Sequence, residues 1–538
     1  MKKILNHLFF PAMLICLLAS CHKIDVPIKT ELTPDVFPQN PSQFIQATGP
    51  AYAALRGNYS LDYWFMQSLS TDEAILPARG GNWYDNQNYI NLHYHNWTKD
   101  HGNTNGTWNW LSVVIGTTNQ ALSILDETMP DDASKTATLA ELKMVRAIAY
   151  FMMMDLYGNV PIVTEYGDFN PKPNTPRKDV FNFIETEVKT NLPYLSPASG
   201  TSTYGRANKY TAFALLAKMY LNAEVYTGAQ RYNDCIAACD SVINSGLYAI
   251  EPRSSYLKMF YPSNGPQMKE FIFAIPYDPA FVALPGTNGF MYHARYDLPR
   301  SMQKTFSMPY TPSAPRSTLP EFYAYFNDPN DIRNQQWLTG PQYNYNGTPV
   351  TVSTTKQGYN QFYTGSDGGA PITYQVTLTP KIELRQSVTA FDLGNDEIAW
   401  NLGYRNNKFY PDSTSTNRNQ SNDVPFLRYS DIILMKAEAI LRGGTATLGH
   451  TPVSLVNMVR SNRTTSPALS AVTLEDIYAE RNREFAWETW HRNDMIRFGK
   501  YENSWGFKTD ANAYKRIFPI PTGAMALNPA LVQNPGYQ

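Results

Sequence analysis

Aromatic and polar side chains are mixed in one segment, residues 70–110, in a way that suits the binding of a sugar. An aromatic ring can stack on the apolar face of a pyranose or furanose, while carboxylate, amide and guanidinium groups bond to the hydroxyls at its rim. The segment offers such rim groups in Asp72, Arg79 and Asp85. Its rings are Trp83, Tyr84, Tyr89, Tyr94, Trp97, Trp108 and Trp110. The segment is therefore a candidate carbohydrate site.

Catalysis has to be weighed for the same segment because it also holds neighbouring carboxylates. Asp72, Glu73 and Asp85 could supply the two acids of a glycoside hydrolase, but sequence spacing does not fix the separation that such chemistry needs. The chain has no G-x-S-x-G nucleophile motif, no P-loop and no metal signature. We expect a protein that is not an enzyme, with a glycoside hydrolase as a remote alternative.

Metal and cofactor binding are not indicated by the sequence. His93 and His95 have strand-like spacing and His101 follows nearby, but no third ligand is placed for zinc. The acidic stretch 327–334 has carboxylate and amide oxygens, yet it lacks the spacing and the glycine of an EF-hand loop. We expect no metal and no cofactor, and the sequence leaves calcium undecided.

The amino terminus has the pattern of an export signal. Lys2 and Lys3 precede an apolar stretch, residues 4–18, that is too short to span a bilayer as a mature helix. Leu-Ala-Ser then precedes Cys21, which is the pattern of a bacterial lipoprotein signal. We expect residues 1–20 to be removed and the Cys21 thiol to carry diacylglycerol, with further acylation of the new amino terminus. An ordinary secretory signal is the alternative.

Composition excludes several classes of partner. The formal net charge is −1, charged residues make up 17%, and no basic run is present, so nucleic acid and an anionic membrane surface are not indicated as partners.

Two groups of side chains in the body of the chain are expected to be buried. Trp97, Trp108 and Trp110 lie nearer to helical sequence, and Cys235 and Cys239 are best explained as free thiols in a helix.

Helical patterns flank a loop-rich middle. Apolar residues recur at three- and four-residue steps from Leu139 to Leu156, and Gly158 ends that run. Further helix pairs are predicted between 209 and 246 and between 428 and 463, with Thr451 as an N-cap. Thr473 and Asp476 form a capping-box-like start to the last helical stretch, where Glu480–Arg483, Glu488–Arg492 and Asp494–Arg497 have the spacing of helix ion pairs.

Five segments in order resemble the SusD/RagB outer-membrane lipoproteins of Bacteroidetes. They are Arg146 to Val163, Gly205 to Leu221, Pro425 to Ile440, Ile477 to Lys500 and Ile517 to Tyr537. The resemblance implies a mainly α fold, with about four tetratricopeptide-like helix pairs, an irregular loop-rich extension and a few short strands. It also implies a SusC-like TonB-dependent transporter as partner, and no catalysis.

The expected organisation follows from the resemblance and the composition together. Residues 1–20 form the lipoprotein signal, and residues 21–250 form an amino-terminal region with helix pairs and the ligand-binding segment. Residues 251–424 form the loop-rich extension, and residues 425–538 form a carboxy-terminal helical region.

The resemblance also indicates which side chains contact ligand. In many glycan-binding members the tryptophan of an R-G-G-x-W-Y-D pattern stacks on sugar, and that position is Trp83, with Tyr84 beside it. A packing role for Trp83 is the alternative. Tyr292 and Arg405, both from the loop-rich extension, are candidates for contacts on the second side of the ligand, and we call them the second-side candidates. His293, Tyr296 and Tyr404 are further possibilities there. Tyr292 could instead pack under the extension, and Arg405 could order its loop through a salt bridge.

The resemblance implies a lipid-anchored protein of the outer membrane that faces the cell exterior, held by Cys21. It would capture oligosaccharides and deliver them to the transporter. A RagB-like peptide-binding lipoprotein is the alternative within the family, and a lipoprotein that only stabilises its transporter is a third possibility.

Overall fold

The computed structural model describes residues 36–281, 293–354, 372–385, 387–415 and 418–537. Helices dominate and strands are few and short, which confirms the expected mainly α fold. The longer helices are α2 (Pro41–Arg56), α5 (Gly102–Thr128), α6 (Ala133–Tyr157), α7 (Arg177–Asn191), α8 (Lys209–Leu221), α10 (Tyr232–Ile243), α14 (Tyr429–Leu441), α15 (Pro452–Arg460) and α16 (Leu474–Phe485). The shorter ones are α3 (Trp64–Ser68), α4 (Asn88–Tyr94), α9 (Ala223–Thr227), α11 (His293–Asp297), α12 (Pro320–Tyr323), α13 (Glu397–Trp400), α17 (His491–Arg497) and α18 (Thr522–Leu527).

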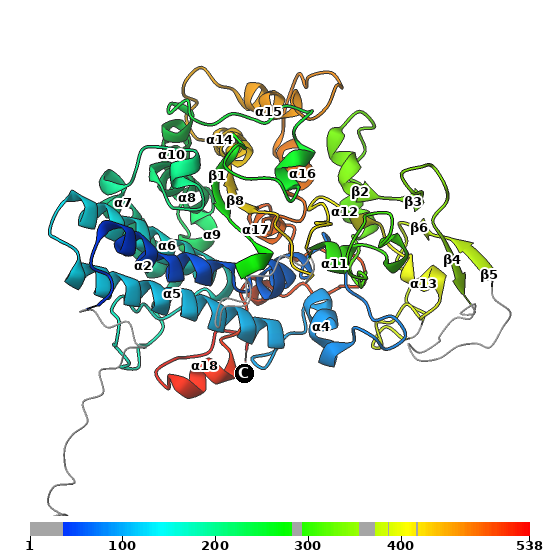
Figure 1. Ribbon diagram of the computed structural model, residues 1–538, viewed down its shortest axis with the longest axis horizontal. Coiled ribbons are helices and arrows are strands. Elements are labelled where there is room, and N and C mark those ends of the chain that lie inside the picture. The colour runs from blue at the N-terminus through cyan, green and yellow to red at the C-terminus, as the bar shows by residue number, and fades with distance from the viewer. Residues whose placement is uncertain (1–35, 282–292, 355–371, 386, 416–417, 538) are drawn as a thin grey trace, which may run out of the picture.

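The long helices stack in sequence to form one side of the molecule (Figure 1). Helix α5 packs against α2 and α6, and α6 packs against α7. Helix α10 lies between α8 and α14, and α14 also packs against α15 and α16. This stacking is consistent with the expected tetratricopeptide-like scaffold.

The helix boundaries follow from capping residues that the sequence analysis identified. Helix α6 contains the predicted apolar run and ends at Gly158, which has a positive φ of 69° that costs glycine little. Thr451 caps α15, with Pro452 in its first turn, and Thr473 and Asp476 form the capping box of α16.

The last helical stretch is broken where sequence spacing predicted a continuing helix. Trp487 and Thr489 both have a φ of 67°, so the chain turns between α16 and α17. The expected Glu480–Arg483 and Asp494–Arg497 pairs are confirmed, each at 2.7 Å. The expected pairing of Glu488 with Arg492 is wrong, because Glu488 lies in the turn and bonds to Lys408 and Arg428 instead.

The middle of the chain consists of loops and short antiparallel ribbons, as expected. Its ribbons are β2 (Trp337–Leu338) with β7 (Arg405–Asn406), β3 (Gly340–Pro341) with β6 (Thr377–Leu378), and β4 (Thr351–Thr354) with β5 (Ile372–Gln375). The longest ribbon pairs β1 (Phe271–Ile275) with β8 (Val424–Arg428), from Phe271 opposite Arg428 to Ile275 opposite Val424. This last ribbon joins the start of the middle region to the start of the carboxy-terminal helices.

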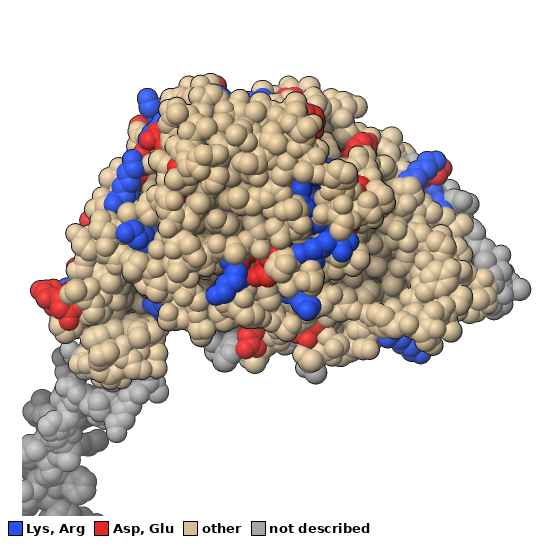
Figure 2. Space-filling model, turned by 90° about the horizontal axis from the view of Figure 1, so that it is seen from above, with Lys and Arg blue, Asp and Glu red and all other residues tan. Residues whose placement is uncertain are grey.

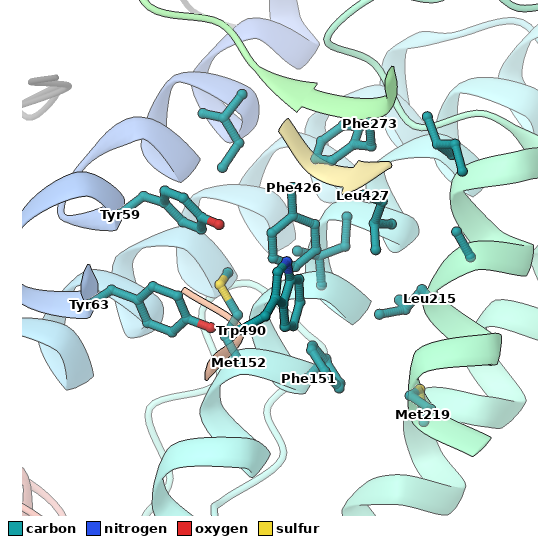
Figure 3. Packing of buried hydrophobic residues seen from close by; sticks show 14 of the residues in the cluster. Tyr59, Tyr63, Phe151, Met152, Leu215, Met219, Phe273, Phe426, Leu427 and Trp490 are labelled. Carbon is teal, nitrogen blue, oxygen red and sulfur yellow. The ribbon is translucent and has the colours of Figure 1, made fainter. Parts of the chain in front are cut away.

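One aromatic cluster connects the helices to that ribbon (Figure 3). The ring of Phe426 in β8 lies 5.3 Å from Trp490, 6.0 Å from Tyr59 and 6.3 Å from Phe273, measured between centroids. Trp490 in turn lies 6.4 Å from Phe151 of α6. Because these rings come from distant parts of the chain, the core fixes the carboxy-terminal helices against the amino-terminal ones.

A fully buried network of charges lies beneath the same ribbon. Glu484 of α16 accepts hydrogen bonds from Arg333, Arg428 and Arg463, at 2.9 to 3.1 Å. Arg428 and Arg463 are also bound by Glu270. Such a network is stable only while every member keeps its partners, because an unpaired buried charge is costly.

The residues that the sequence analysis placed in the core are buried. Trp97, Trp108 and Trp110 are 1%, 5% and 6% exposed, which confirms that prediction. Cys235 and Cys239 lie on α10 as buried free thiols, as expected.

Asp423, next to β8, gives the protein a pH-dependent stability. Its carboxylate accepts from the Tyr204 hydroxyl at 2.6 Å and from the Tyr277 amide at 3.0 Å, and burial raises its pKa from 3.8 to about 6. The folded state therefore holds this proton more tightly than the unfolded state. The associated stability is present below about pH 4 and is lost as the pH rises through 6.

We expect the Asp423→Asn variant to lack this dependence. In urea unfolding, the stability of the natural protein relative to the variant should fall by about 2 kcal/mol between pH 4 and pH 7. Asp131→Asn is the control for the loss of a surface carboxylate, because the Asp131 side chain is 93% exposed. Parallel pH profiles for the natural protein and Asp423→Asn would contradict the assignment.

Candidate functional site

The candidate site is built on the Arg79–Asp85 turn, which the fold holds against the 392–400 segment. The amides of Gly80 and Gly81 each donate to the Asp392 carboxylate at 2.7 Å. Both glycines have positive φ values, 62° and 82°, so this close approach uses conformations that other residues resist. The turn therefore presents Trp83 in a fixed position.

Trp83 meets a ring from the loop-rich middle of the chain. Its indole is half-buried, and it lies edge-to-face against Tyr296 of α11, with centroids 5.4 Å apart and an interplanar angle of 81°. The Trp83 backbone has a φ of 68°, which is unusual for a large side chain. Strain of this kind is maintained where the surrounding structure fixes it, often at ligand sites.

Polar side chains follow Trp83 on the same turn. Tyr84 is 38% exposed and Asp85 is exposed. Tyr89 lies next to Asp85, and burial together with the Asp85 charge raises the pKa of its hydroxyl. The structure thus brings Trp83, Tyr84, Asp85 and Tyr296 together, and we call these four residues the Trp83 platform.

Arg79 does not reach this surface, although it begins the same turn. Its side chain is fully buried, donates to the carbonyls of Ala399 and Pro315, and lies 5.4 Å from the Trp400 ring centre. Burial, with a contribution from Arg405, lowers its pKa well below the ordinary value. Arg79 supports the turn from below, and the structure does not place it in contact with ligand.

Asp72 is also occupied inside the protein. Its carboxylate oxygen lies 2.5 Å from Nε2 of His491 on α17. Glu73 beside it is fully buried and accepts from the Trp487 amide at 2.7 Å. The two carboxylates are part of the core, whereas Asp85 lies on the exposed turn, so the structure does not gather these acids at one open site.

The second-side candidates have different outcomes. Arg405 is fully buried and donates to the carbonyls of Trp400, Leu402 and Gly403, so it orders its own loop, although through carbonyls and not through a salt bridge. Its expected contact with ligand is not supported by this placement. Tyr292 lies outside the described residues. His293 is buried, with its ring stacked 4.7 Å from Phe409.

A cavity lined in part by residues 299–301, shortly after Tyr296 in the sequence, was not anticipated from the sequence. It has a volume of about 340 Å³, and we call it the Trp400 pocket. Its lining residues are Pro299, Arg300, Ser301, Ala314, Val352, Asn395, Glu397, Trp400 and Asn401. These come from four separate stretches between residues 299 and 401, and no local motif marks them. The only signal in the sequence was a tryptophan among polar residues at 395–401.

A larger cavity of about 550 Å³ lies between α5, the 161–169 loop and α18. Exposed apolar side chains gather at it, including Phe169 at 90% and Leu527 at 88%. Its apolar character is less suited to a sugar than the mixed lining of the Trp400 pocket.

The three histidines considered as metal ligands have structural roles. His93 accepts from the Phe507 amide, His95 bonds to the Ser70 carbonyl, and His101 caps α5. Of the possible calcium ligands, Asp328 accepts from Thr464 and Ser466.

Charged side chains on one face of the molecule do not form a large patch of one sign. On the face shown in Figure 2, most of the surface is uncharged and the acidic and basic side chains are interspersed. Within the described ranges, no helix has the length and apolar character needed to cross a membrane.

Comparison with known proteins adds to these observations. The SusD family model matches residues 214–537, and a second model, described as starch-binding and associating with the outer membrane, matches residues 46–221. The chain belongs to the SusD family. The family resemblance of the five sequence segments is therefore confirmed.

Relatives of this SusD-family chain include characterised proteins and solved structures. The starch-binding protein SusD of Bacteroides thetaiotaomicron is 24% identical over 87% of this chain and 84% of its own length. A laminarin-binding SusD-like protein superposes with a TM-score of 0.69 at 21% identity, covering 93% of this chain and all of the other. Surface glycan-binding protein A of Bacteroides thetaiotaomicron, in complex with laminarihexaose, gives 0.67 at 19% identity, covering 92% of this chain and 99% of the other. At these identities the structures show a shared fold.

The placement of Arg405 leads to a testable prediction. Arg405→Ala should lower the free energy of unfolding by about 3 kcal/mol, because three carbonyls, two of them in buried hydrogen bonds, lose a charged donor. The affinity of the folded fraction for a disaccharide that covers only the Trp83 platform should not change. Chemical denaturation and calorimetric titration of the same sample measure both quantities. A loss of affinity at unchanged stability would return Arg405 to the ligand site.

Proposed function

We propose that this SusD-family protein binds an oligosaccharide at the Trp83 platform and is not an enzyme. The observation that carries the proposal is the half-buried Trp83 ring, held against Tyr296 beside the exposed Tyr84 and Asp85. A sugar needs an apolar surface for its ring face and polar groups for its hydroxyls, and the platform supplies both in a fixed geometry.

The finer proposal concerns location and delivery. Cys21 would carry lipid that anchors the protein to the outer membrane, with the platform facing the exterior. A SusC-like TonB-dependent transporter would receive the captured oligosaccharide. Membership of the SusD family and the match to a family described as associating with the outer membrane support this arrangement.

Modest affinity would suit delivery better than tight binding. Dissociation constants from micromolar to millimolar correspond to about 8 down to 4 kcal/mol of binding free energy. One stacked ring with a few hydrogen bonds can supply that amount, while still allowing release to a transporter.

Calorimetric titration of the purified mature protein tests the proposal. The panel would contain starch and laminarin oligosaccharides, together with fructans, mannans, xylans, pectins, chitin fragments and a mixture of short peptides. Saturable binding to one class of glycan is the expected result. Binding to peptides alone would favour the peptide-capturing alternative and reject the proposal.

A further inference from the structure

The Trp400 pocket is lined in part by residues 299–301 and 395–401, and the first of these segments begins two residues after α11, which carries Tyr296 of the Trp83 platform. Trp83 contacts Tyr296, and four residues later Arg300 lies over the Trp400 ring, 5.1 Å from its centre. Tyr296 and Arg300 are at most about 15 Å apart, since each residue advances the chain by no more than 3.8 Å. Arg79, at the base of the Trp83 turn, also lies against Trp400. The platform residue Tyr296 and the pocket residue Arg300 are therefore close enough for one short oligosaccharide to span.

The Trp400 ring is held in place before any ligand arrives. Its Nε1–H donates to Oδ1 of Asn395 at 3.0 Å. Asp396 caps α13 by accepting from the Ala399 amide at 2.8 Å, and Arg385 bonds to the same carboxylate. A ring that is already oriented loses little conformational entropy on binding.

The pocket lining has the mixed chemistry of a sugar site. Trp400 offers an aromatic ring with the Arg300 guanidinium over it, Arg300 and the side-chain amide groups are hydrogen-bond donors, and Glu397 is an acceptor. The lining includes one cation, Arg300, and one anion, Glu397, so their formal charges cancel. A neutral ring bearing hydroxyls fits this balance, whereas the carboxylate of an acidic sugar would meet Glu397. The volume of about 340 Å³ is at the small end of ligand sites.

We propose that the Trp400 pocket is a second subsite, which holds a further neutral sugar unit of the same oligosaccharide that stacks on Trp83. This inference rests on the proposed function and deepens it. It assigns the protein a preference for neutral chains long enough to occupy both places.

A chain-length series tests the second subsite. Calorimetric titration of the mature protein would use maltose through maltoheptaose and laminaribiose through laminarihexaose. The affinity of the natural protein should rise with length until both places are filled. Trp400→Ala should bind the longest ligand about tenfold more weakly, or about 1.4 kcal/mol, and the shortest ligand equally well. Trp83→Ala should lose affinity for both the longest and the shortest ligand.

Two further variants keep the test decisive. Arg300→Ala changes an exposed side chain, so it should fold and show the same length-dependent loss even if Trp400→Ala does not fold. Phe169→Ala removes an exposed ring at the other cavity and should behave like the natural protein at every length.

Three results would overturn the inference, and they differ from one another. If Trp400→Ala and Arg300→Ala match the natural protein at all lengths, the pocket is not a subsite, while the proposed function stands. If the natural protein prefers uronic-acid oligosaccharides and Arg300→Ala removes that preference, the neutral assignment is wrong. If the natural protein binds no glycan in the panel or the series, the proposed function fails and the second subsite fails with it.

Discussion

Trp83→Ala is expected to weaken oligosaccharide binding by at least about thirtyfold, or about 2 kcal/mol, which would abolish detectable binding of a weak ligand. The indole is the aromatic surface of the platform, and its position is fixed by the Gly80–Gly81 contact with Asp392 and by Tyr296. Alanine removes the surface that excludes water from the apolar face of the sugar. Calorimetric titration with the best ligand of the panel measures the loss.

Two controls separate binding from folding in this variant. Trp83 also packs against the core, so thermal unfolding of Trp83→Ala has to be measured alongside the titration. Trp83→Phe keeps a smaller ring and should retain part of the affinity. If Trp83→Ala binds as tightly as the natural protein, Trp83 has only the packing role that the sequence left open.

The second large effect is expected on stability. Glu484→Gln should lower the free energy of unfolding by about 3 to 5 kcal/mol, because Arg333, Arg428 and Arg463 lose a shared buried carboxylate. Although burial raises the pKa of Glu484, the arginines, Arg463 first, outweigh this and hold the pKa well below its usual range. The carboxylate is therefore charged at neutral pH, and the amide that replaces it does not balance the guanidinium charges.

Urea unfolding at neutral pH measures this effect, with Glu475→Gln as the matched control. Glu475 is on the same helix, but its side chain is 63% exposed in its pair with Lys500, so its loss should cost less than about 1 kcal/mol. Equal unfolding midpoints for Glu484→Gln and the natural protein would show that the buried network does not stabilise the fold.

Local patterns in the sequence were sufficient to predict most of the helical scaffold. The apolar steps from Leu139 to Leu156 correspond to α6, and Thr451 and Thr473 cap the helices that they were expected to cap. These features depend on residues within one or two turns of one another. Glu488 was misplaced because two left-handed backbone residues, Trp487 and Thr489, interrupt a stretch whose spacing is otherwise helical.

The candidate site could be predicted only in part, because burial of a charged side chain depends on distant segments. Asp72 meets His491, which is 419 positions away, and Arg79 reaches the carbonyl of Ala399, 320 positions away. Both were attractive as sugar ligands by residue type alone. The Trp400 pocket could not be predicted for the same reason, since residues 299–301 and 395–401 become neighbours only in the folded chain.

A crystal structure of the mature protein with its best-binding oligosaccharide would show directly whether the ligand binds at Trp83. We expect one sugar ring stacked on Trp83, with hydroxyls bonded to the polar groups beside it. A ligand bound elsewhere, with the Trp83 ring left uncovered, would contradict it.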